Sequence, residues 1–146
     1  MASPALLDAS VLIALLDVGH VHHDIAHDWF ADNRVRGWAT SPLTENALLR
    51  IASNPRYGSN WERLPVLTNR LRAFCATADH QFWPDTLSLR DNAVFDLSLA
   101  SQQHLTDVYL LGLAKTNGGV LATFDRTIPL NVVVGASLDL LEVIGP

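Results

Sequence analysis

Short apolar runs alternate with amphipathic stretches along the 146 residues of this chain. The apolar runs predict strands at residues 5–8, 37–40, 81–83, 120–124 and 131–134. Apolar positions at helical spacing predict helices at residues 10–16, 22–31, 42–52, 61–75, 92–101 and 107–116. The segment 138–144 suits a final strand or a short helix equally. Strands that alternate with helices are typical of an α/β fold with a mostly parallel sheet.

The sequence also marks where two of these helices begin. Ser41 stands before a proline, which gives a helix cap followed by proline at the first helical position. Thr106 is predicted to cap the helix that starts at Asp107, and the glycines of Asn117–Gly119 close it. These boundaries place Glu45 and Asp107 in the first turns of their helices.

Four acidic residues are predicted to meet at one edge of the sheet. Asp8 and Asp125 each follow directly on a buried strand, whereas Glu45 and Asp107 lie in first helical turns. In a parallel sheet, the carboxyl ends of strands and the amino ends of the following helices share one edge, where ligands bind. Taken singly, each acid also suits a turn or the dipole of a helix.

Taken together, the four acids have a chemical consequence. Neighbouring carboxylates repel one another and raise each other's pKa unless a cation neutralises them. Oxygen ligands without histidine or cysteine suit Mg²⁺ or Mn²⁺. Such a site makes hydroxide from bound water and stabilises the charge that develops in phosphoryl displacement. The sequence therefore predicts a divalent-metal site at this edge.

Four stretches of the chain carry a resemblance to a known family. They are residues 6–13 (LLDASVLI), 41–50 (SPLTENALLR), 104–114 (HLTDVYLLGLA) and 121–126 (LATFDR). They look like the PIN-domain ribonucleases, in the right order and spacing. Within that family the chain resembles the VapC toxins of type II toxin–antitoxin operons. The likeness covers nearly the whole chain, and the block around Thr106 and Asp107 is its most specific part.

The resemblance implies a fold and a set of site residues. The fold is a PIN-like three-layer α/β/α sandwich with a mostly parallel central sheet of four to five strands, formed by residues 1–146 as a single domain. The residues implied as catalytic and metal-binding are the four acids Asp8, Glu45, Asp107 and Asp125. The polar positions implied to line the site are Ser10, Thr106 and Thr123.

The resemblance also implies an activity and partners. The activity is Mg²⁺-dependent endoribonuclease cleavage, with Mn²⁺ as the other candidate ion, of a structured RNA (tRNA or rRNA). Attack by metal-activated water leaves a 5′-phosphate and a 3′-hydroxyl, and cleavage inhibits translation. The partners are a small VapB-like antitoxin that inhibits the site and a second copy of the chain in a homodimer.

Composition bears on the compartment. The hydrophobic fraction of 49% excludes intrinsic disorder. No long uncharged apolar run is present, so we expect no membrane span. A single cysteine, Cys75, excludes an internal disulfide and a cysteine-cluster zinc site, and it fits the cytoplasm. We interpret Cys75 as a small buried hydrophobe.

The distribution of charge bears on how RNA would bind. The net charge is −5, yet residues 34–90 hold eight arginines, the side chain that suits bidentate contact with phosphate. Within this Arg-rich middle we expect phosphate attraction from Arg50, Arg56, Arg70 and Arg72. Arg126, beside Asp125, is a further RNA-contact candidate. Ion pairs that hold an acid in place are the alternative role for Arg50 and Arg126.

Other functions remain open on the sequence alone. A haloacid-dehalogenase-like phosphatase also begins with a strand and an aspartate, but it needs a second acid where this chain has Ser10. A response-regulator receiver needs a lysine at the end of a late strand, whereas Lys115 falls within a predicted helix. A catalytically silent PIN-like module that only binds partners is disfavoured by the intact acid set.

Two further groups of residues have less specific patterns. Four histidines crowd residues 20–27, and His23 and His27 have the spacing of a zinc pair on a helix, but no third ligand is evident. We expect these histidines at the surface. Asp91 and Asp96 precede the Asp107 block, and we expect both on a solvated face. The sequence leaves open whether Asp96 approaches the metal.

Overall fold

The computed structural model describes residues 3–145, which form a five-stranded sheet in the order β3-β2-β1-β4-β5. Every neighbouring pair of strands is parallel. The strands are β1 (Ala5–Leu7), β2 (Trp38–Thr40), β3 (His80–Phe82), β4 (Val120–Thr123) and β5 (Leu141–Val143). The central strands β1 and β4 are short and buried, as the apolar runs predict.

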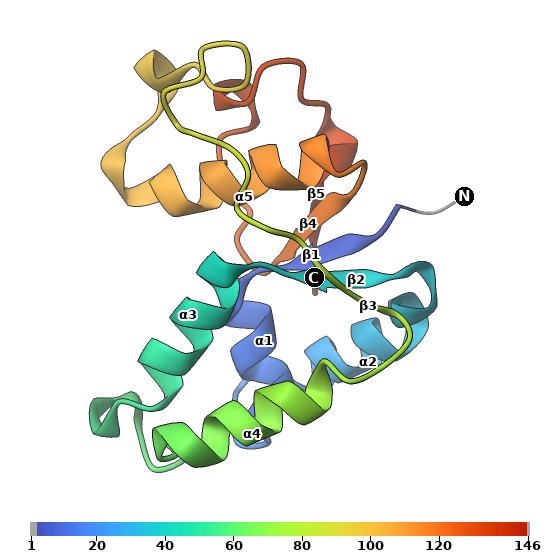
Figure 1. Cartoon of the computed structure of the whole chain (residues 1–146), viewed down its shortest axis with the longest axis vertical. Helices are drawn as coiled ribbons and strands as arrows, with labels where there is room; N and C mark the ends of the chain where they lie inside the picture. The colour runs from blue at the N-terminus through green and yellow to red at the C-terminus, as the bar shows by residue number, and fades with distance from the viewer. Residues whose placement is uncertain (1–2, 146) are drawn as a thin grey trace.

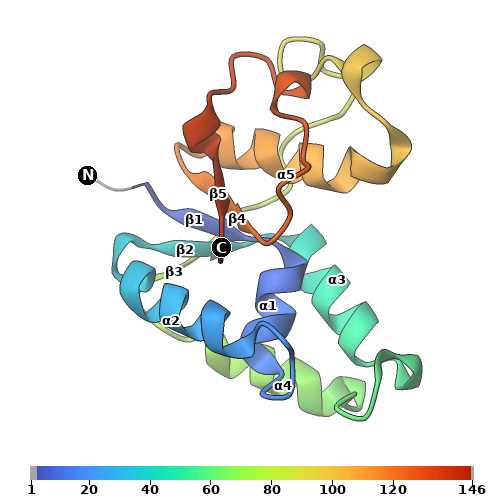
Figure 2. The ribbon, with the colours of Figure 1, turned by 180° about the vertical axis from the view of Figure 1, so that it is seen from behind.

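Helices cover both faces of this sheet (Figures 1 and 2). On one face lie α1 (Ala9–Leu16), α2 (His23–Asn33), α3 (Pro42–Ala52) and α4 (Leu64–Phe74). On the other face lies α5 (Leu105–Thr116), together with the irregular segments before and after it. Each face encloses its own apolar core. The predicted three-layer α/β/α fold is confirmed. No helix within residues 3–145 has the length and apolarity to cross a bilayer.

The helices that follow β1 and β2 are capped by side chains at the strand ends. Asp8 accepts a hydrogen bond from the backbone N–H of Ala9, the first residue of α1, at 2.7 Å. Ser41 and Thr44 form a reciprocal capping box at the start of α3, which confirms Ser41 as the cap. Both helices therefore begin at a fixed point on the same edge of the sheet.

The predicted cap of α5 is wrong by two residues. The helix begins at Leu105, so His104 occupies the cap position and Thr106 lies inside the first turn. A 3₁₀ turn at Gln102–His104 runs directly into the helix. That turn supplies backbone geometry which continues into α5, so no side-chain cap is needed.

Two predicted elements are absent from the described chain. Residues 92–101 do not form a helix, because the side chains of Asp91 and Asp96 bond backbone N–H groups two residues ahead and favour turns. Residues 131–134 do not form a strand, because Leu130–Val132 is a 3₁₀ turn. A single antiparallel bridge between Phe95 and Val133 joins these two segments over α5.

The ambiguous C-terminal segment contains both kinds of structure. Leu138–Leu140 is a 3₁₀ turn, and β5 follows it immediately. The strand pairs with β4 through Leu121 and Leu141. The sheet therefore gains its fifth strand from the end of the chain.

Candidate metal centre

Asp8 stands at the carboxyl end of β1, where it is half-buried. Its carboxylate accepts the Ala9 N–H through one oxygen and the Thr123 hydroxyl through the other, at 2.8 Å. Burial raises the pKa of Asp8 above its ordinary value, the two hydrogen bonds oppose that rise, and the charge of Asp125 adds to it. The net direction is upward.

Asp125 follows β4, two residues after Thr123, on the strand next to β1. Its backbone N–H donates to the Thr123 hydroxyl oxygen at 3.1 Å. Its carboxylate accepts from the hydroxyl and the backbone N–H of Thr127, at 2.6 and 2.8 Å, and these bonds hold the pKa of Asp125 below its usual value. Asp125 is therefore an ionised group with a fixed orientation.

Asp107 lies in the first turn of α5 and completes a group of three carboxylates with Asp8 and Asp125. Burial, followed by the negative charges of Asp8 and Asp125, raises the pKa of Asp107 to about 6. The nearby His104 works in the opposite direction. Three separate segments of the chain thus place their acids close enough to disfavour full ionisation of Asp107.

This donor set fits a hard divalent cation. Ligand atoms of His104, Asp107 and Asp125 all lie within 4.8 Å of one another, and Asp8 faces the same two aspartates electrostatically. Carboxylate oxygens dominate the group, as Mg²⁺ and Mn²⁺ prefer. A cation among them would relieve the repulsion that raises the pKa of Asp107. PIN domains are generally dependent on divalent metals, and this acidic cluster agrees with that dependence.

Glu45 lies at the same edge of the sheet, in the first turn of α3, but its carboxylate belongs to a second group. The Thr40 hydroxyl donates to it at 2.7 Å and accepts from His80 Nε2 at 2.8 Å. One ligand atom each of Glu45, Cys75 and His80 lies within 4.8 Å of the others. The buried Thr40 hydroxyl already satisfies Glu45 and His80, so this second group is a hydrogen-bond network.

The three predicted supporting residues have different environments. Thr123 is fully buried and bonds Asp8 and Asp125, so it links two of the acids. Ser10 is half-buried in the first turn of α1. Thr106 is exposed next to Asp107.

His104 is a site residue that the sequence analysis missed. It lies three residues before Asp107, a spacing that puts both side chains on one side of a helix. That spacing is the only signal in the sequence, and it is visible only if the helix is known to begin before Thr106. The 3₁₀ turn at residues 102–104 is what brings the imidazole to the acids.

The two RNA-contact candidates lie at the surface. Arg50 is exposed near the end of α3. Arg126 is exposed after β4 and donates to the Gly145 carbonyl at 3.1 Å. Arg72, from the Arg-rich middle, lines an open pocket of about 240 Å³ together with Glu45. Arg72 thus shares an open cavity with one of the predicted acids.

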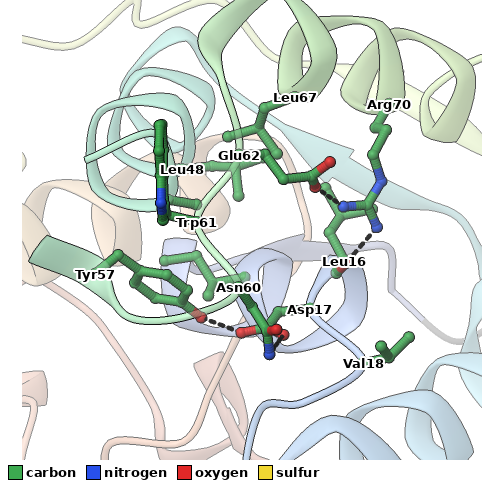
Figure 3. A pocket seen from close by; sticks show the side chains of 12 residues that line it. Leu16, Asp17, Val18, Leu48, Tyr57, Asn60, Trp61, Glu62, Leu67 and Arg70 are labelled. Atoms are coloured by element: carbon green, nitrogen blue, oxygen red, sulfur yellow. Dashed lines mark hydrogen bonds and ion pairs between the residues drawn. The ribbon is translucent and has the colours of Figure 1, made fainter. Parts of the chain in front are cut away.

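A larger cavity, of about 290 Å³, lies between α1, α3, α4 and the α3–α4 connection (Figure 3). None of the four predicted acids lines it. Tyr57 donates to Asp17 at 2.5 Å on one wall, and Arg70 donates to Glu62 and to the Leu16 carbonyl on another. Arg70 therefore holds this wall together, and its attraction of phosphate stays a prediction.

The histidine segment and Cys75 are less clear-cut than the sequence suggests, since only His27 of the four histidines is exposed and Cys75 is half-buried. His23 bonds the Ala14 carbonyl through Nδ1 at 2.7 Å and packs against His27, and no metal-ligand group within residues 3–145 includes either ring. Cys75 packs against the core under α1–α4, and burial, followed by the charge of Glu45, raises the pKa of its thiol to about 11. Asp91 and Asp96 are exposed and bond neighbouring backbone.

Comparison with known proteins supports the same interpretation. The family model of the PIN domain matches residues 5–130. Ribonuclease VapC44 of Mycobacterium tuberculosis is 42% identical over 134 residues, which is 91% of this chain and 94% of that protein. Ribonuclease VapC39 of the same organism is 38% identical over 141 residues, 96% of this chain and 99% of that protein. The chain therefore belongs to the PIN-domain family, among its VapC members.

Proposed function

We propose that this chain is a Mg²⁺-dependent endoribonuclease and the toxin of a VapBC-type toxin–antitoxin pair. Mn²⁺ is the other candidate ion. The substrate is a structured RNA, a tRNA or an rRNA, whose cleavage inhibits translation. The names of the similar proteins support the ribonuclease activity.

One observation carries this proposal. Asp8, Asp107 and Asp125 come from three separate segments, and their mutual repulsion contributes to a pKa of about 6 at Asp107. A fold that holds such acids together without a cation is paying a cost in stability. Divalent-metal binding is the function that explains this arrangement.

The proposed ligand set is Asp8, Asp107 and Asp125, with Glu45 at the same sheet edge. When bound, the cation would supply hydroxide from water and offset the charge that develops on the phosphate. Thr123 fixes Asp8, and Thr127 fixes Asp125, so both carboxylates keep one orientation while RNA binds. The Thr40 hydroxyl holds Glu45 in the same way.

The proposed partners are a small VapB-like antitoxin and a second copy of the chain. Several large apolar side chains are strongly exposed, among them Val18, Val21 and Leu138. Protein partners commonly bury exposed apolar side chains of this kind. Co-purification of a small protein encoded beside the toxin, and light scattering of the free chain, test these two partners separately. We propose the cytoplasm as its location, where the single cysteine stays reduced.

Mapping of cleavage ends tests the activity. Total RNA is incubated with the purified chain in Mg²⁺, in Mn²⁺ and in EDTA, and new ends are sequenced. The proposal expects discrete internal cuts with 5′-phosphate ends in either metal and none in EDTA. Cleavage that persists in EDTA, or products without a 5′-phosphate, would contradict it.

A further inference from the structure

His104 lies within the group of acids, although the resemblance assigns no histidine to it. The residue precedes α5 and is half-buried. One ligand atom of its ring lies within 4.8 Å of ligand atoms of both Asp107 and Asp125. A cation held by all three groups would need these side chains to rotate toward one another, because the ligands of one small ion lie closer together than 4.8 Å.

Hydrogen bonds connect the ring to Asp125 and fix which nitrogen faces it. Thr127 donates its single hydroxyl proton to Asp125 at 2.6 Å, so its oxygen accepts from His104 Nε2 at 3.3 Å. The other ring nitrogen, Nδ1, then accepts from the Ser101 hydroxyl at 3.3 Å. Nε2 is thus the ring nitrogen that faces the acids, and Nδ1 faces Ser101 on the other side of the ring.

The position of His104 has no structural explanation in the helix itself. Its side chain makes no capping hydrogen bond to α5. The two hydrogen bonds of the ring are both long. The ring is therefore free to move toward the acids at little cost in stability.

We infer that His104 is a nitrogen ligand of the same cation that Asp107 and Asp125 bind. The inference rests on the proposed function and extends its ligand set beyond oxygen. With the cation present, Nε2 would hold it through its lone pair and the ring proton would lie on Nδ1 instead. There it is donated to the Ser101 hydroxyl, the kind of second contact that orients metal-bound histidines.

A nitrogen ligand changes which ion the site prefers. Mg²⁺ binds oxygen almost exclusively, whereas Mn²⁺ and the later transition metals accept imidazole readily. His104 should therefore add affinity for Mn²⁺ and little for Mg²⁺. Of Mg²⁺ and Mn²⁺, we therefore expect Mn²⁺ to bind this chain with the higher affinity.

The test is electron spin-echo spectroscopy of Mn²⁺ bound to the wild-type chain, His104→Gln and His27→Gln. His27 is an exposed histidine on α2 and serves as the matched control. We expect the imidazole nitrogen signature in the wild type and in His27→Gln, and its loss in His104→Gln. Calorimetry should show Mn²⁺ binding weakened about tenfold in His104→Gln, with Mg²⁺ binding changed less than about twofold.

The outcomes separate the inference from the proposed function. Mn²⁺ that binds the wild type without a nitrogen signature, or that binds His104→Gln equally well, overturns the inference and leaves the proposed function intact. A wild-type chain that binds no divalent cation overturns both. Circular dichroism of His104→Gln, expected to match the wild type, checks that a loss of affinity does not come from unfolding.

Discussion

Thr123 donates its buried hydroxyl to the Asp8 carboxylate across the junction of β1 and β4, at 2.8 Å. The same oxygen accepts the backbone N–H of Asp125. One threonine thus sets the distance between two acids that come from opposite ends of the chain. The relationship gives the site a rigid base on the sheet.

Removing this hydroxyl should weaken metal binding. Thr123→Val keeps the shape of the side chain but removes one of the two donors to Asp8 and leaves the Ala9 N–H, which raises the pKa of Asp8 further and loosens its orientation. We expect at least about a tenfold loss in Mn²⁺ affinity by calorimetry, the effect typical of losing a hydrogen bond that orients a metal ligand. Thr123→Ser restores the donor and should stay near the wild type. Equal affinities for the two variants would contradict this role.

The raised pKa of Asp107 predicts how stability depends on pH. In the metal-free chain the folded state holds the Asp107 proton up to a pKa of about 6, whereas the unfolded chain releases it near the ordinary aspartate pKa of 3.8. The free energy of unfolding should therefore fall as pH rises between these values. Because the side chain is half-exposed, we expect Asp107→Asn to gain only about 1 kcal/mol at neutral pH.

Urea denaturation in EDTA measures this effect. The gain of Asp107→Asn over the wild type should be present at neutral pH and vanish near pH 3.5, where both states of the wild type are protonated at this position. Asp139→Asn, at an exposed acid in the 3₁₀ turn before β5, should show no such pH dependence. A variant equally stabilised at both pH values would contradict the assignment.

Protons and metal should compete for Asp107. The cation needs the ionised carboxylate, so affinity should fall as pH drops below about 6, by up to about tenfold for each pH unit. Calorimetric titration of Mn²⁺ between pH 5 and 7.5 measures the slope. In Asp107→Asn the affinity should be weak, and its slope in this range should be smaller. A wild-type affinity independent of pH would show that Asp107 does not bind the ion.

Arginines on the α3 and α4 side should attract RNA. We expect Arg50→Ala and Arg72→Ala each to weaken RNA binding in a cleavage-deficient background and to reduce its salt dependence by about one ion. Arg90→Ala removes an exposed arginine on the opposite face of the sheet and is the matched control. Metal affinity should not change in any of the three. Unchanged RNA binding across a salt series would place the RNA elsewhere.

Much of the fold is predictable because strand ends and helix starts leave local marks. The positions of Asp8 and Asp125 at the sheet edge are predictable because each follows a short buried strand. Ser41 is predictable as a helix cap because a proline follows it. The predicted helix at residues 92–101 is absent because the helical spacing of its apolar residues competes with hydrogen bonds from the side chains of Asp91 and Asp96 to nearby backbone. The segment also pairs with distant chain through the bridge from Phe95 to Val133, and no local pattern encodes that pairing.

The site is less predictable than the fold for a physical reason. Sequence position fixes which edge of the sheet an acid reaches, but not which way its carboxylate points. Glu45 shows this, since its carboxylate bonds Thr40 and lies near His80, a residue 35 positions away. His104 shows the opposite case. No strand end or helix start marks it in the sequence, yet a single 3₁₀ turn places it beside Asp107 and Asp125.

The central claim is that the carboxylate of Asp8 is needed for metal-dependent RNA cleavage and not for folding. Asp8→Asn retains an oxygen that can accept the Ala9 N–H, so α1 stays capped while the charge is lost. Asp91→Asn is the matched control, because Asp91 also accepts a backbone N–H but is exposed and outside the acid group.

The deciding measurement is RNA cleavage in Mg²⁺ by the wild type, Asp8→Asn and Asp91→Asn, with thermal unfolding of each. The account predicts at least about a hundredfold loss of cleavage for Asp8→Asn alone, with a melting temperature equal to or above that of the wild type. A folded Asp8→Asn chain that cleaves RNA at the wild-type rate would contradict it.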